Sequence, residues 1–177
     1  QANQNLILNK LFNTNNDVSY LIGGNIYYGS GFHYISYLIE LFTLNFPLIS
    51  EFDQLTKLLL SKHLTVFLFF ITSGIFIKKI LRIITQNKFV SNFGAFFYLL
   101  YPYLLGHSFF NVKDIPFMSI WVLCTYYLIK NLNNFFNKNT FKIKDLLILS
   151  ISTSFLLSIR INGIIIFLEY LIFLIFY

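Results

Sequence analysis

Cysteine and charge are both scarce in this chain of 177 residues. Cys124 is the single cysteine, which excludes an internal disulfide and any zinc site built on cysteines. Charged residues make up 11% of the sequence, whereas hydrophobic residues make up 56% and the mean hydropathy is +0.67. Soluble domains carry about 25% charged residues and cannot bury so much apolar surface at this size. The sequence therefore predicts that a lipid bilayer surrounds much of the chain.

The chain also lacks an initiator methionine and the pattern of basic, apolar and small-residue regions that marks a signal peptide. Its last run, "IIIFLEYLIFLIFY", stops inside an apolar stretch. We therefore expect residues 1–177 to be a single partial membrane domain that belongs to a longer protein.

Long apolar runs follow residue 57 and predict an all-α fold, a polytopic transmembrane helical bundle. Four to five transmembrane helices are expected. Their approximate ranges are 58–77, 89–107, 115–130, 146–160 and 163–177.

The segment 1–57 is expected to lie outside the bilayer core as the first non-cytoplasmic loop. Asn and Gly turn signals dominate it before residue 33. Next, "FHYISYLIELFTLNFPLI" is apolar but contains His33 and Glu40 and is broken by Pro47. This composition favours an interfacial helix within that loop, although a spanning helix is an alternative.

Basic residues orient the predicted bundle. They gather in the segments that follow the first and third predicted spans, whereas the segment between those two holds only Lys113. The first group is Lys78, Lys79, Arg82 and Lys88, and the second is Lys130, Lys138, Lys142 and Lys144. By the positive-inside rule both groups are cytoplasmic. The net charge of +6 is thus interpreted as a topological signal, and no nucleic-acid partner is expected.

The stretch "GHSFFNVKDIPFM" (106–118) concentrates polar side chains between two apolar runs. Pro116 suits the first turn of a helix, and Asp114 just before it is placed to cap that helix. A cap explains only Asp114, whereas Lys113 suits a phosphate, and His107 and Asn111 suit a carboxylate or a sugar hydroxyl. Taken singly, each of the three is more often an ordinary solvated loop residue.

This stretch carries a resemblance to a known family. Together with "YYGSGFHYISYLIE", "SKHLTVFLFF", "FFYLLYP" and "SIRINGIII", it resembles the family 39-type glycosyltransferases, a protein mannosyltransferase-like group of C-type integral-membrane glycosyltransferases. The resemblance implies a multi-pass protein of the cell membrane, by analogy the bacterial inner membrane. It also implies a polyprenyl-phosphate sugar as donor and transfer to an acceptor, a lipid, glycan or protein, on the non-cytoplasmic face.

The resemblance also implies roles for individual residues. Asp17 takes the place of the catalytic base, although relatives often carry an acid nearer the "YYG" segment, where this chain has Asn25. Asp114 takes the place of the second acidic residue, which binds acceptor or donor phosphate, with a divalent metal (Mg²⁺ or Mn²⁺) as an open option.

Two ionisable residues inside or beside apolar runs are further candidates for functional roles, since such residues are costly in a bilayer. Arg160 is predicted to emerge on the same face as Asp114 and to bind the carrier phosphate through its guanidinium; an interfacial, snorkelling arginine is the alternative. Glu169 lies in the last apolar run, where we expect a basic partner from outside this sequence. With Arg160 it leaves open a transporter or channel fragment, and a non-catalytic membrane assembly subunit is a third possibility.

Overall fold

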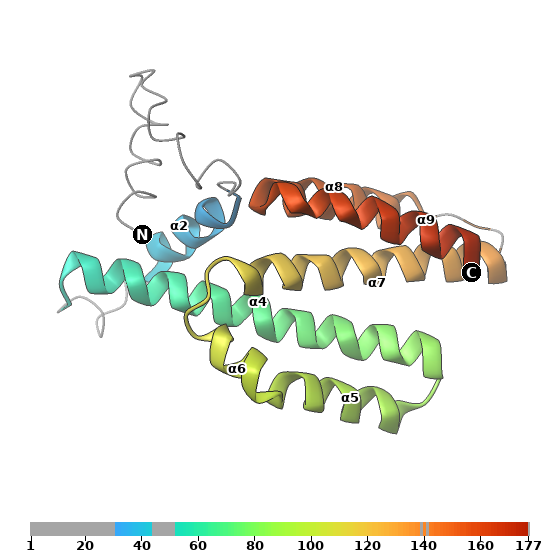
Figure 1. The fold of residues 1–177 in the computed structure, drawn as a ribbon, viewed down its shortest axis with the longest axis horizontal. Helices are drawn as coiled ribbons and strands as arrows, with labels where there is room; N and C mark the ends of the chain where they lie inside the picture. The colour runs from blue at the N-terminus through green and yellow to red at the C-terminus, as the bar shows by residue number, and fades with distance from the viewer. Residues whose placement is uncertain (1–30, 44–51, 139, 141, 177) are drawn as a thin grey trace, which may run out of the picture.

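The structure, a computed structural model, describes residues 31–43, 52–138, 140 and 142–176. Throughout this part of the chain the regular structure is helical and there are no strands, which confirms the all-α prediction. The helices are α2 (Gly31–Thr43), α4 (Gln54–Thr85), α5 (Lys88–Leu100), α6 (Pro102–Ser108), α7 (Asp114–Lys138), α8 (Ile143–Ile159), the 3₁₀ helix η3 (Ile161–Ile165) and α9 (Ile166–Phe176) (Figure 1).

Helix α4 is longer than the predicted span 58–77. It has 32 residues and ends where Gln86 takes a left-handed conformation, with φ of 53°. Lys78, Lys79 and Arg82 therefore lie on its last turns and not in a loop. Lysine and arginine are good helix formers, and cations are favourable near a helix C-terminus, so the helix continues past the apolar run.

The predicted span 89–107 is broken into two helices. Tyr101, which precedes Pro102, has extended backbone dihedral angles, and α5 and α6 meet there at an angle of 61°. A proline disfavours helical geometry in the residue before it and suits the first position of a new helix. The break therefore follows directly from Pro102.

The C-terminal half forms three antiparallel helices with one interruption. Helix α7 extends beyond the predicted 115–130 and ends at Lys138, so Lys130 lies well inside the helix and not in the segment that follows it. Helix α8 ends at Arg160, whose backbone is extended, and η3 then leads into α9. The predicted spans 146–160 and 163–177 thus correspond to α8 and to η3 with α9.

Two helices in the described ranges are long and apolar enough to cross a membrane, within Thr56–Thr85 and Asp114–Asn137. The bent pair α5–α6 adds a third if it counts as one span. Helix α8 has 17 residues, and Ile161–Phe176 is also short; both fall below the about 20 residues that a spanning helix needs.

Helix α4 lies at the centre and packs against α2, α5 and α7, while α7 packs against α8. Phe70, Cys124 and Leu156 are fully buried in the core between these helices. Gly74 brings α4 close to α5, since a Cβ there lies 2.6 Å from Leu99 Cδ2. Small residues commonly permit such close approach between helices in membranes.

The arrangement gives the bundle two distinct ends (Figure 1). The α4–α5 turn and the start of α8 lie at one end, which we call the basic end; the α6–α7 loop, α2 and the last turn of α8 lie at the other, which we call the loop end. The basic end carries Lys78, Lys79, Arg82, Lys88, Lys130, Lys142 and Lys144. Many large apolar side chains of α5 and α9 are exposed between the ends, as expected of surfaces that face lipid.

Candidate functional site

The loop between α6 and α7 is organised by the side chain of Asn111. Its Oδ1 accepts hydrogen bonds from the backbone N–H groups of Lys113 (3.1 Å) and Asp114 (2.9 Å). These are the N–H groups at the beginning of α7, which lack partners within the helix. The capping role that the sequence suggested for Asp114 is therefore filled by Asn111, and the Asp114 carboxylate has other partners.

The Asp114 carboxylate joins two distant parts of the chain. Its Oδ1 accepts a hydrogen bond from Arg160 Nη1 at 2.5 Å, and its Oδ2 accepts one from Asn111 Nδ2 at 3.0 Å. Arg160 stands between α8 and η3, 46 residues further along the chain. Asp114 and Arg160, which are predicted to emerge on the same face, therefore meet in a direct ion pair.

His107 completes the group through the same asparagine. Asn111 Nδ2 lies 3.1 Å from His107 Nδ1. Because Asn111 Oδ1 already accepts two N–H groups, its Nδ2 is the donor, and His107 Nδ1 must be the acceptor. The neutral imidazole then carries its proton on Nε2. The ring also contacts Tyr103 and Phe110, with ring centroids 4.4 and 5.3 Å apart.

We call His107, Asn111, Asp114 and Arg160 the polar cluster. Within it, the Arg160 side chain is largely buried and 23% exposed, and its Cζ lies 5.7 Å from the centre of the Phe117 ring. The Asp114 side chain is 60% exposed. The cluster therefore presents an accessible carboxylate beside a guanidinium that is fixed by packing, an arrangement suited to a hydroxyl and a phosphate at the same place.

The other predicted site residues have different outcomes. Lys113 is exposed in the same loop, next to the polar cluster in sequence. Asp17 and Asn25 lie outside the described residues. For the metal option, no group of three or more His, Cys, Asp or Glu side chains occurs in the ranges that the structure describes, and Asp114 is the sole carboxylate of the polar cluster.

A second polar group, between α2 and α4, was missed by sequence reasoning. Lys62 on α4 is buried, with 3% exposure. His33 on α2 is also buried, and its Nδ1 has no hydrogen-bond partner. Burial, aided by the positive charge of Lys62, lowers the pKa of His33 to about 4. Burial raises the pKa of Glu40, and Lys62 opposes that rise. The sequence signal that could have indicated this polar group is Glu40, a lone acidic residue in an apolar segment.

Glu169, for which we expect a basic partner from outside this sequence, has two hydrogen-bond partners within the described chain. Its carboxylate accepts hydrogen bonds from Trp121 Nε1 and from Thr125 Oγ1, the latter at 2.6 Å. Trp121 and Thr125 are one turn apart on α7, so a single acid fixes α9 against α7. Both oxygens of this partly buried carboxylate thus have a hydrogen-bond donor.

Comparison with known protein families, with curated proteins and with solved structures finds no match.

Proposed function

We propose that this chain is part of a polytopic membrane glycosyltransferase that takes a sugar from a polyprenyl-phosphate donor on the non-cytoplasmic face. The observation that carries the proposal is the ion pair between Asp114 and Arg160, because it joins a carboxylate and a guanidinium, a group suited to phosphate, at the loop end. The resemblance to family 39-type glycosyltransferases supports the same assignment.

The chemistry assigns one task to each group. The acceptor hydroxyl attacks C1 of the sugar, the bond from C1 to the phosphate oxygen breaks, and the hydroxyl proton passes to a carboxylate base. In this proposal Asp17 is the base and Asp114 holds the acceptor. Arg160 stabilises the negative charge that develops on the departing polyprenyl phosphate. Before the phosphate binds, Asp114 holds the Arg160 guanidinium in position.

The distribution of charge supports a membrane topology with the polar cluster outside. The cations of the α4–α5 turn and of the α7–α8 connection share the basic end, opposite the polar cluster. Under the positive-inside rule the basic end is cytoplasmic. In this topology α4, the pair α5–α6, α7, α8 and α9 all contribute to the membrane bundle, and α2 lies at its outer surface.

The transporter alternative rests on Glu169, and the contacts of Glu169 weaken it. A transport pathway needs an ionisable group that can reach water or substrate near the middle of the bilayer. The Glu169 carboxylate is instead held by Trp121 and Thr125 between two packed helices. A structural role in joining α7 and α9 accounts for both contacts.

The test is a transfer assay with membranes from cells that express the full protein. The probes are undecaprenyl phosphates that carry radiolabelled mannose or glucose, and the measurement is label moved to membrane acceptors or released into water. Asp114→Asn and Arg160→Gln should each lower transfer by about 100-fold or more, since one lost charge-stabilising group typically costs that much.

The matched control is Asp53→Asn. Asp53 is an exposed acid before α4, and its side chain makes no capping bond to that helix. This variant should transfer sugar at the wild-type rate. Wild-type membranes that move neither sugar contradict the proposed function, and full transfer by Asp114→Asn removes Asp114 from the site.

A further inference from the structure

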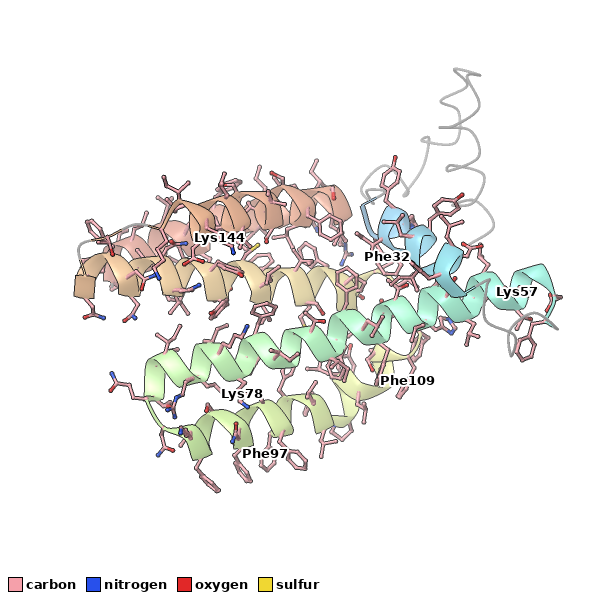
Figure 2. All side chains as sticks on the ribbon, turned by 180° about the vertical axis from the view of Figure 1, so that it is seen from behind. Phe32, Lys57, Lys78, Phe97, Phe109 and Lys144 are labelled. Atoms are coloured by element: carbon pink, nitrogen blue, oxygen red, sulfur yellow. The ribbon has the colours of Figure 1, made fainter. Side chains whose placement is uncertain are left out.

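A pocket of about 450 Å³ opens at the basic end, between α4, α5 and α7. This volume is within the usual range of small-molecule sites. It is lined by Lys78, Lys79, Arg82 and Ile83 of α4, by Lys88, Ser91 and Asn92 of α5, and by Tyr126 of α7. Lys78 is labelled at this end in Figure 2. We call it the basic pocket.

The charge of the basic pocket is one-sided. Four of its eight lining residues are cations and none is acidic. No carboxylate in the described part of the chain forms an ion pair with Lys78, Arg82 or Lys88; Lys79 Nζ lies over the rings of Phe76 and Tyr126, at 4.7 and 5.4 Å. Like charges gathered in one place repel each other, and a bound anion relieves that repulsion.

The hydrogen-bond donors that the basic pocket offers to an anion are side chains and not the N–H groups of a helix end. The first N–H groups of α5 are occupied, because Asn87 Oδ1 accepts from Phe89 (2.8 Å) and Val90 (3.4 Å). Ser91 Oγ donates to Lys88 O. An anion in the basic pocket would therefore be bound by ammonium and guanidinium groups, with the amide of Asn92 and the hydroxyl of Tyr126 as neutral donors.

The surface beside the basic pocket favours a lipid as the source of that anion. Phe89, Phe93 and Phe97 form an exposed stripe along α5, with centroids 5.6 Å apart for the first pair and 4.5 Å for the second. Figure 2 shows Phe97 projecting from the outer side of α5. A phosphate in the basic pocket that carries acyl chains can lay them along this stripe, which a soluble phosphate cannot do.

We propose that the basic pocket binds the phosphate headgroup of an anionic phospholipid from the cytoplasmic leaflet. Basic pockets between membrane helices on that side are suited to such headgroups, and each nearby cation strengthens binding about fivefold. This site is separate from the polar cluster, which lies at the opposite end, and it does not depend on the proposed transfer reaction.

The experiment measures lipid retention by the purified full chain in detergent, with native mass spectrometry as the readout. The probes are dioleoyl-phosphatidylglycerol, dioleoyl-phosphatidylcholine and inorganic phosphate. The wild type should retain one phosphatidylglycerol at least tenfold more strongly than phosphatidylcholine, and millimolar phosphate should not displace it. The double variant Lys79→Gln/Arg82→Gln should lose about 25-fold in retention.

The matched control removes two cations from the same end but outside the basic pocket, in Lys142→Gln/Lys144→Gln. It should retain phosphatidylglycerol within about twofold of the wild type. An equal loss in both double variants assigns the effect to general surface charge and overturns the proposal. Equal retention of the two lipids by the wild type overturns it without any variant, and displacement by inorganic phosphate identifies a soluble ligand instead of a lipid.

Discussion

The two ends of this bundle treat positive charge in different ways. At the loop end Arg160 is paired with Asp114 and lies over the Phe117 ring. At the basic end Lys130 is paired with Asp145 at 2.8 Å, but the cations that line the basic pocket have no carboxylate partner among the described residues. A paired cation is fixed for a defined task, whereas a cluster of cations without acids is available to an external anion. Lysine and arginine side chains thus indicate two kinds of site, one with a paired cation and one with a cluster of cations open to an anion.

The largest expected effect concerns the placement of the two ends on opposite sides of the membrane. Phe109→Cys at the loop end should react with a membrane-impermeant maleimide in intact cells, whereas Lys142→Cys should react only after permeabilisation. Phe109 and Lys142 are exposed, and the native Cys124 is buried and should stay unlabelled. Labelling of Lys142→Cys in intact cells would reverse the topology and contradict the proposed position of the polar cluster.

The next prediction concerns the loop end alone, where the buried His33 should make the stability of the fold depend on pH. Because the pKa of His33 is lowered to about 4 by burial and by Lys62, the folded protein favours the neutral imidazole. The stability from this preference is complete above the unfolded pKa of about 6.5 and is lost as the pH falls towards 4, by about 3 kcal/mol at pH 4. Thermal unfolding in detergent from pH 7 to pH 4 measures it.

The control for this prediction is His33→Gln, in which the acid-dependent part of the loss should disappear. The comparison between the two proteins at each pH cancels the titration of all other groups. Identical pH curves for wild type and variant would show that His33 does not loosen the contact between α2 and α4.

The smallest effect concerns the paired and unpaired cations of the basic end. Asp145→Asn removes the partner of Lys130, and because Lys130 is 32% exposed the loss of unfolding free energy should be about 1–2 kcal/mol. Lys78→Gln breaks no ion pair and should change the unfolding free energy by less than about 0.5 kcal/mol. Denaturation in neutral detergent compares the two variants, and equal losses of unfolding free energy would contradict the difference between paired and unpaired cations.

Much of the fold could be predicted from hydropathy, since apolar runs indicate where helices lie. The residues at which the helices begin and end were harder to predict. Lys78, Lys79 and Arg82 were read as a loop, although cations extend a helix as readily as apolar residues do. Pro102 was a visible signal for the break after α5, but the apolar run around it concealed its effect.

The polar cluster was partly predictable for a related reason. A short stretch holding His107, Asn111 and Asp114 stands out against an apolar background, and alternating spans place Arg160 on the same side. The pattern does not reveal which side chain bonds to which, so the capping role went to Asp114 and not to Asn111. The buried pair His33 and Lys62 depends on how α2 packs on α4, and no local pattern records that packing.

The 61° bend at Tyr101 makes the bundle uneven in thickness. The 32 residues of α4 extend about 48 Å, whereas the 13 of α5 rise about 20 Å and the tilted α6 adds only about 5 Å along that direction. This pair is thus shorter than the roughly 30 Å hydrocarbon core of a bilayer. If the pair counts as one span, the membrane beside α5 has to be thinner there, which would bring the polar cluster at the end of the pair closer to the lipid.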